Sequence, residues 1–185
     1  MTTSFTRMDE STAEQWNVII EQTISAQPRV AEQVLDMLRQ LEGITDGFSC
    51  NQLVHALQTA TLAEQSGADD EVVVAALCHD IGKLISVPNH PRIAAEILRP
   101  YVRPEVFTMI LVHQDFQGKH YYHHLGGDPD AREQHRDALS AEEWALAEQF
   151  ADEWDQRAFD PDGETFPLEH FEPKVRAVFA NAKML

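Results

Sequence analysis

Apolar residues recur every three or four positions along most of the chain, which is the period of amphipathic α-helices. We expect a first helix from Ser11 to about Ala26, where Ser11 and Glu14 can form a capping box. A second helix is expected to begin at Pro28, since proline is favoured in a first turn, and to stop at Gly43. No stretch alternates as a strand would and no repeat is found, so the pattern predicts an all-α protein.

The same periodicity predicts the rest of the helices. They are expected between the turn at 46–49 and the stop at Gly67, over about 70–84, over 91–98, around 106–113, from Ser140 to about Arg157, and over about 168–179. The helix over 70–84 is apolar on nearly every side, which places it at the centre of a bundle. The segment from Gln114 to Gly127 is the one long irregular stretch expected, and its polar and aromatic residues are typical of a pocket wall or lid.

Length and charge narrow the class of protein. The chain has 185 residues, enough for one domain with a sizeable core. Its 14 basic and 31 acidic residues give a formal net charge of −17, which disfavours nucleic acid and anionic membranes as partners. The N-terminus lacks a signal pattern, and no apolar run approaches the roughly 20 residues that cross a bilayer. We therefore expect a soluble, cytoplasmic protein that binds a small molecule; its oligomeric state stays open.

His79 and Asp80 follow directly on the apolar run over 72–77, in the helix expected to be the most buried. Burying a charged carboxylate without a partner costs several kcal/mol. One interpretation is a hydrogen-bonded His–Asp pair that is satisfied within the core. The other is a metal site. The two cysteines, Cys50 and Cys78, lack the paired spacing of a zinc or redox motif and are expected to be reduced, packed side chains.

Other residues of metal-ligating types accompany the expected helices. His55 and His113 lie on apolar stripes, while His90 and Asp160 lie next to helix ends. Taken alone, His90 can be a helix cap and Asp160 a turn residue before Pro161. Imidazole nitrogen and carboxylate oxygen suit first-row transition metals, and the set is large enough for two ions. The candidate metal ligands are His55, His79, Asp80, His90, His113 and Asp160.

The order of these residues resembles the HD-domain superfamily. The resemblance rests on His55, placed 24 residues before His79-Asp80-Ile81-Gly82-Lys83, and on a distal aspartate. His90 and His113 match the two extra histidines of its two-metal members. The resemblance covers roughly residues 48–162.

Together with the chain length and the helix pattern, that resemblance predicts an all-α, single-domain helical bundle over residues 1–185. Residues 1–45 would supply covering helices, 48–162 the metal-binding core and 163–185 a C-terminal helix.

Local sequence around the ligands is similar to one branch of the superfamily, the mixed-valence di-iron oxygenases that include myo-inositol oxygenase and the phosphonate-cleaving oxygenase. The similarity lies in residues 154–160, in Asn51-Gln52-Leu53-Val54-His55, and in Ser66-Gly67-Ala68-Asp69 followed by 74–77. The last two resemble the phosphonate branch. Lys83 departs from that branch, which commonly has His there, and the connection from Asp80 to His90 is short for an oxygenase.

The resemblance implies two iron ions, Fe²⁺ and Fe³⁺, and dioxygen as co-substrate. The reaction would be cleavage of a C–P or C–C bond in a small hydroxylated anion such as a 1-hydroxyphosphonate. The competing function is a metal-dependent phosphohydrolase acting on a nucleotide or small phosphate ester, because two metals can also ionise a water and clamp a phosphoryl group. A degenerate domain used only for binding is less favoured, since no ligand position is lost.

Several residues are candidates for contact with the substrate. Lys83 lies four residues after His79, on nearly the same helix face, so its ammonium can point into the metal cavity as a catalytic group; the alternative is a solvated lysine. Lys119 and Arg157 can pair with an anionic headgroup or be surface charges. The substrate-binding candidates are Gln52, Lys83, Lys119, Arg157, Tyr121 and Tyr122.

Overall fold

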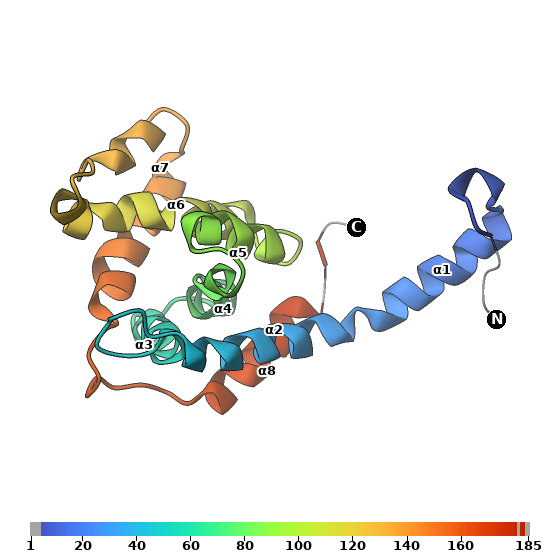
Figure 1. Cartoon of the computed structure of the whole chain (residues 1–185), viewed down its shortest axis with the longest axis horizontal. Coiled ribbons are helices and arrows are strands. Elements are labelled where there is room, and N and C mark those ends of the chain that lie inside the picture. The colour runs from blue at the N-terminus through green and yellow to red at the C-terminus, as the bar shows by residue number, and fades with distance from the viewer. Residues whose placement is uncertain (1–4, 181, 184–185) are drawn as a thin grey trace.

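The computed structural model describes residues 5–180 and 182–183, and over these residues the chain is helical with no strand, which confirms the all-α fold class. The helices that Figure 1 labels are α1 Ala13–Ala26, α2 Pro28–Gln40, α3 Gln52–Gln65, α4 Asp70–Cys78, α5 His90–Leu98, α6 Pro104–Tyr121, α7 Ala141–Gln149 and α8 Leu168–Phe179. Within these ranges, no helix is long and apolar enough to span a membrane.

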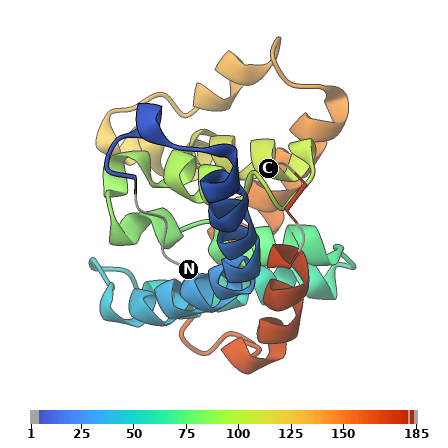
Figure 2. The same cartoon turned by 90° about the vertical axis from the view of Figure 1, so that its right-hand side faces the viewer.

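Helix α4 lies at the centre of the bundle, as its apolar sequence predicts. Every residue from Val72 to Cys78 is buried, and α4 packs against α3, α6 and α8. Figure 2 shows two groups of helices, with α2, α3 and α8 below and α5, α6 and α7 above. Large side chains such as Phe150, Phe171 and Phe179 are fully buried between them, and each contributes about 1.5–3 kcal/mol relative to an exposed position.

Helix caps explain where the central helices begin. The Asn51 side chain accepts from the Val54 backbone N–H at 2.9 Å and starts α3, and Asp69 does the same for α4. The capping box that we expect at Ser140 and Glu143 is present at the start of α7. These caps fix where α3 and α4 begin, ahead of His55 within α3 and of His79 after the end of α4.

The first capping box is shifted by one residue from our expectation. Thr12 caps α1, with Gln15 as its partner, in place of Ser11 and Glu14. The Ser11 hydroxyl is engaged elsewhere, since it donates to the Met8 carbonyl at 2.6 Å and accepts from the Trp16 indole at 2.8 Å.

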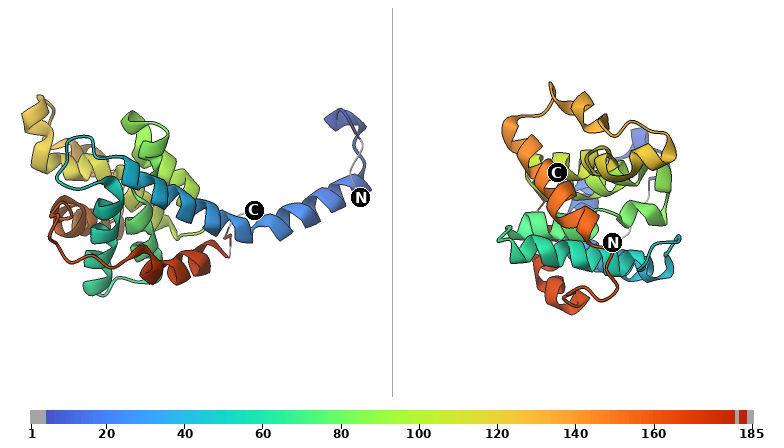
Figure 3. Two further views of the ribbon diagram at one scale, coloured as in Figure 1. Left: turned by 60° about the horizontal axis from the view of Figure 1, so that its bottom comes forward. Right: turned by 90° about the vertical axis from the view of Figure 1, so that its left-hand side faces the viewer.

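Within residues 5–45, the covering role falls to α2 and to Leu41 in the 3-10 turn that follows it. Ala31, Val34, Leu35 and Leu38 of α2 are buried against the core. Helix α1 has no buried residue and extends away from the bundle, as the left view of Figure 3 shows.

Several expected element boundaries are wrong. The helix expected from Ser140 to about Arg157 ends as an α-helix at Gln149 and is followed by a π-helical turn over Phe150–Trp154. The helix predicted over about 70–84 ends as an α-helix at Cys78, and Ile81–Leu84 form a 3-10 turn. The segment predicted to be irregular from Gln114 is helical, because α6 continues through Tyr121. A 3-10 turn over Tyr122–Leu125 follows, and the chain turns at Gly126 with φ of 75°.

Candidate metal centre

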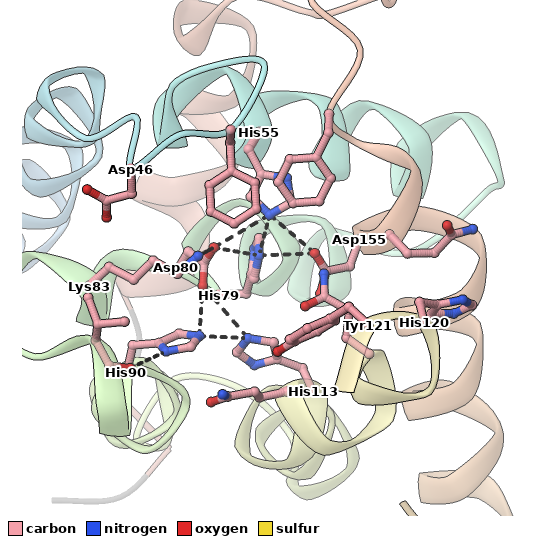
Figure 4. A pocket seen from close by; sticks show the side chains of 16 residues that line it. Asp46, His55, His79, Asp80, Lys83, His90, His113, His120, Tyr121 and Asp155 are labelled. Atoms are coloured by element: carbon pink, nitrogen blue, oxygen red, sulfur yellow. Dashed lines mark hydrogen bonds and ion pairs between the residues drawn. The ribbon is translucent and has the colours of Figure 1, made fainter. Parts of the chain in front are cut away.

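Five parts of the fold bring polar side chains to one point inside the bundle. His55 comes from α3, His90 from the first position of α5 and His113 from the middle of α6. His79 and Asp80 follow the end of α4, and Asp155 begins a 3-10 turn after α7. All of these side chains are buried, with residue exposures between 1% and 5%. Figure 4 shows their imidazole and carboxylate groups converging.

The first group of ligand atoms surrounds the Nε2 atoms of His55 and His79, which lie 3.0 Å apart. Asp155 Oδ1 is 3.2 Å from His55 Nε2 and 3.5 Å from His79 Nε2. Asp80 Oδ2 completes the group at 3.5 Å and 3.3 Å from the same two nitrogens. Two imidazoles and two carboxylates therefore face one small volume.

The second group lies on the other side of Asp80. His90 Nε2 is 3.0 Å from Asp80 Oδ1 and 3.2 Å from His113 Nε2. His113 Nε2 is 3.8 Å from the same carboxylate oxygen. Asp80 thus presents Oδ2 to one group and Oδ1 to the other, which is the arrangement of a carboxylate that bridges two ions.

The remaining nitrogen of each histidine is held by a backbone carbonyl. The Nδ1 atoms of His79, His90 and His113 each lie 2.7 Å from the carbonyl oxygen three residues earlier in the chain. His55 Nδ1 lies 2.9 Å from the Ala158 carbonyl. A carbonyl can only accept, so each Nδ1 carries a proton and each ring turns its Nε2 toward the centre. This is the orientation that metal-ligating histidines require.

Such a cluster is unfavourable without a cation. The Nε2 atoms of neighbouring rings face one another, and within the described residues the buried oxygens Asp80 Oδ1 and both Oδ of Asp155 have no hydrogen-bond partner. Leaving a buried carboxylate unsatisfied costs several kcal/mol. One ion in each group would satisfy these atoms, so the donor set fits two metals with imidazole and carboxylate ligands.

The electrostatics of the cluster favour a positive charge next to its two carboxylates. Burial opposes the charged form of His79, but the carboxylates of Asp80 and Asp155 outweigh it and raise the pKa of His79 to about 10. Burial also opposes ionisation of Asp80 and Asp155, yet His79 and the other imidazoles hold the pKa of both carboxyl groups well below its usual range. Burial lowers the pKa of His113, which keeps that ring neutral. In the metal-free protein a proton on His79 therefore replaces part of the charge of a cation.

Asp160 is not part of this cluster, and the prediction that it is a metal ligand is wrong. Asp160 is exposed; its side chain accepts from the Asp162 backbone N–H at 3.0 Å, and its carbonyl accepts from Gln58. Asp160 is therefore a turn residue. This is the alternative that the sequence offers for it, because Pro161 follows. Asp155 takes the place in the cluster that we assigned to Asp160.

A signal for Asp155 is present in the sequence. Asp155 lies four residues after Ala151 and next to Trp154, both buried, so helical spacing continues the apolar stripe directly to it. A π-helical turn over Phe150–Trp154 precedes Asp155 and sets its direction. Such turns are frequent at functional sites. The periodicity of the helix, read strictly, favours Asp155 over Asp160.

Gly82 allows His90 to reach the cluster. A Cβ atom at Gly82 would lie 2.3 Å from the His90 carbonyl oxygen and 2.7 Å from its Cα, which is too close for any side chain. The first residue of α5 therefore packs directly on the backbone of the 3-10 turn that follows Asp80. This contact gives the glycine of the His-Asp-Ile-Gly-Lys sequence a physical role.

Lys83 and Gln52 lie beside the bridging carboxylate, as their candidate roles require. Lys83 Nζ donates to Asp80 Oδ2 at 2.6 Å and to Gln52 Oε1 at 2.9 Å. The Lys83 side chain is 14% exposed, so it is not a solvated surface lysine. The Gln52 side-chain amide nitrogen is buried without a partner in the described residues.

The other substrate-binding candidates divide into two sets. Tyr121 lines the cavity in front of the metal cluster, whereas Tyr122 packs over Gly118 and its hydroxyl approaches Asp115. Lys119 is half-exposed and pairs with Asp152, and Arg157 is exposed and pairs with Glu153. Lys119, Arg157 and Tyr122 do not line the cavity. The structure therefore contradicts their assignment as residues of the substrate pocket.

The cavity in front of the cluster has a volume of about 400 Å³ and is reached by side chains of α3, α6 and the turns around Asp80 and Asp155. Phe159 stacks on the His55 ring with centroids 4.1 Å apart, and Phe48 stacks on Phe159 at 5.1 Å. These rings shield one side of the first ligand group. His120 and Gln156 also line the cavity and were not among our candidates.

The fold and the site define a helical protein with a buried His/Asp centre suited to metal ions. A family model described as "HD domain" matches residues 53–160, which is more than half of the chain, and the chain belongs to the HD-domain family. Proteins of this family are generally metal-dependent enzymes. No curated protein matches the chain.

Proposed function

We propose that this protein is a di-iron oxygenase that cleaves a C–P bond, or a C–C bond, in a small hydroxylated anion. The asymmetry of the two ligand groups carries the proposal. The group of His90, His113 and Asp80 offers two imidazoles and one carboxylate, while the other group has a second carboxylate, Asp155. Two histidines and one carboxylate with open positions are typical of non-haem Fe(II) sites that use oxygen.

When bound, the iron ions would supply oxygen activation and a binding point for the substrate hydroxyl. The chain's own part would be to supply Asp80 between the two ligand groups, and it fixes every imidazole through its Nδ1. Phe48 and Phe159 keep water from the face of His55. A dry, preorganised site strengthens the electrostatic interactions within it.

The volume of the cavity and the net charge of the chain support a small substrate. A volume of about 400 Å³ accommodates a compact molecule, and the acidic exterior of a chain with net charge −17 offers nothing to a polyanionic polymer. For a 1-hydroxyphosphonate the proposed reaction consumes one dioxygen and yields a carboxylic acid and phosphate. The carbinol carbon is oxidised, the C–P bond breaks, and both oxygen atoms are retained in the products.

Lys83 is proposed as the catalytic group that anchors a substrate oxygen next to Asp80. Two of its three N–H donors are accounted for by Asp80 and Gln52, which leaves one for the substrate. We expect Lys83→Ala to suppress turnover while both metals stay bound. Unchanged turnover in that variant would remove Lys83 from the mechanism.

The decisive experiment starts with protein purified without oxygen. We expect two iron ions per chain and a mixed-valence signal by electron paramagnetic resonance after partial oxidation. Addition of 1-hydroxyphosphonates under oxygen should then give oxygen uptake with matching phosphate release. Protein that holds only magnesium or manganese and never gives the mixed-valence signal would contradict the proposal.

A phosphohydrolase is the second candidate, and one observation favours it. Two groups that share the carboxylate of Asp80 can also hold metals at the spacing that clamps a phosphoryl oxygen and ionises water. This candidate predicts phosphate release from nucleotides or phosphate esters in the absence of oxygen. The same preparation, assayed with and without oxygen, separates the two functions.

A further inference from the structure

His120 is a polar residue of the cavity wall that the metal centre does not use. It comes from the last turn of α6, lines the cavity, and its side chain is 32% exposed. In Figure 4 it lies on the Asp155 side of the cluster, beyond Tyr121, whereas Lys83 lies on the Asp80 side. A substrate bound at the metals therefore has Lys83 near one end and His120 near the other.

The imidazole of His120 is fixed by Asp152. His120 Nε2 lies 2.9 Å from Asp152 Oδ1, and within the described residues Nδ1 has no hydrogen-bond partner. Burial opposes ionisation of the Asp152 carboxyl, but hydrogen bonds from Arg132, His120 and Lys119 outweigh it and hold the pKa of Asp152 well below its usual range. Asp152 is therefore ionised at neutral pH. An ionised carboxylate only accepts, so Nε2 carries a proton and Nδ1 is left for a ligand.

A buried arginine holds Asp152 in turn. Arg132, with a side chain only 6% exposed, donates to Asp152 Oδ1 at 2.9 Å and to Oδ2 at 3.2 Å. It also donates to the Phe116 carbonyl at 2.5 Å and lies over the Phe116 ring. A two-pronged contact of this kind fixes orientation as well as charge. The result is a rigid support, anchored inside the fold, for one partly exposed imidazole.

The charges of the cavity indicate what His120 can bind. Lys119 and Arg157 lie outside the cavity, and Lys83 is shared between Asp80 and Gln52. Gln117 and Tyr121 also line the cavity and carry donors, but His120 differs from them because an ionised carboxylate and a buried arginine hold its ring. A hydrogen bond from Nδ1 to an anionic oxygen requires a second N–H on the ring, which then donates to Asp152 from Nε2 and to the anion from Nδ1.

We propose that His120, positioned by Asp152 and Arg132, is a specificity-determining residue that hydrogen-bonds an anionic oxygen at the end of the substrate remote from Lys83. The inference rests on the proposed function for the statement that the substrate is a small anion. It assigns the recognition of that anion to a residue that neither binds metal nor belongs to the His-Asp sequence.

The test measures binding of methylphosphonate to metal-loaded protein by titration calorimetry. His120→Leu removes the hydrogen bond at similar size, and Lys119→Leu is the matched control, because Lys119 contacts the same Asp152 but not the cavity. We expect at least about tenfold weaker binding in His120→Leu, as for a lost hydrogen bond to a charged group, and unchanged binding in the control. Where turnover is measurable, KM for a hydroxyphosphonate should rise more than kcat falls.

Equal affinity in the wild-type protein and His120→Leu would overturn the inference, because the metals alone would then bind the anion. Failure of the wild-type protein to bind methylphosphonate would also overturn it. The proposed function fails separately. If methylphosphonate binding depends on His120 but the protein consumes no oxygen, then His120 binds the anion and the protein is not an oxygenase.

Discussion

At the scale of single residues, the account depends on two oxygens of Asp80 that face different groups of histidines. Each histidine is fixed by a carbonyl bond at its Nδ1, so no ring has to turn when a metal binds. The carboxylates Asp80 and Asp155 are buried and lack partners for particular oxygens. These orphaned atoms make the site a metal centre rather than a satisfied polar core.

The assignment of Asp155, in place of Asp160, as a metal ligand can be tested directly. Asp155→Asn should weaken the metal of the first group by about tenfold or more, since it removes a ligand charge that points at His55 and His79. Asp160→Asn is the matched control and should bind two metals as before, because its side chain only accepts from the Asp162 N–H. Metal content by elemental analysis is the measurement, and a loss confined to Asp160→Asn would restore the original assignment.

The raised pKa of His79 predicts proton release on metal binding. Since that pKa is about 10, His79 is protonated at neutral pH in the metal-free protein, and a metal must displace the proton. Metal affinity should therefore increase as pH rises from 7 toward 10. Calorimetry in buffers of different ionisation enthalpy should show release of about one proton with the first metal. Affinity independent of pH over this range would contradict the prediction.

The sequence predicts most of the ligands, for a physical reason. His55, His79, Asp80, His90 and His113 stand out because strong metal ligands on apolar stripes conflict with burial unless they share a partner. Asp155 and Asp160 are five positions apart in one acidic segment; the apolar period favours Asp155, but it does not reveal the π-helical turn that sets the direction of the Asp155 side chain. Lys119 pairs with Asp152, which only the fold brings near, whereas Arg157 pairs with Glu153 at local i,i+4 spacing.

At the scale of elements, the site is built from ends and turns of helices. The α-helical pattern ends at Cys78, and the 3-10 turn over Ile81–Leu84 brings Gly82 against the first residue of α5. The sequence does not predict this ending, because the apolar run continues through Ile81 and Leu84. Likewise α6 continues beyond the expected end, since residues such as Gln114 and Gln117 face the cavity and hide the apolar period.

Gly82→Ala tests the close contact between these elements. The added Cβ would meet the His90 backbone at 2.3 Å, so α5 must shift and carry His90 away from Asp80. We expect loss of the second metal and destabilisation of about 1–3 kcal/mol, as for an overpacked core. Gly43→Ala is the control, because nothing lies within 4 Å of its Cβ position. Metal content and thermal unfolding are the readouts; two metals retained in Gly82→Ala would show that the contact is not needed.

At the scale of the whole molecule, one bundle joins distant parts of the chain around the metals. Helix α4 is central, and α2 and α8 cover the side away from the cavity-forming α5 and α6. The all-helical class follows from hydrophobic periodicity, which is the strongest signal in the sequence. The direction of α1, away from the bundle, does not follow, because its apolar residues have the same spacing as those of a packed helix.

Metals should stabilise this bundle as a whole, because the ligands come from several elements that separate on unfolding. Metal that binds only the folded chain adds about 4 kcal/mol when its concentration is about 1,000 times Kd. We expect a chelator to lower the melting temperature, and His113→Gln to show a smaller response to the chelator. Unfolding that is indifferent to chelation in the metal-loaded wild-type protein would contradict a centre shared between helices.

The most direct test of the two-metal centre is anomalous diffraction from crystals grown with iron and without oxygen. The account predicts two peaks about 3.5–4 Å apart, the spacing of two-metal sites, with Asp80 between them. One peak should be bound by His55, His79 and Asp155, and the other by His90 and His113. A single peak, or an ion held by Asp160 instead of Asp155, would contradict the account.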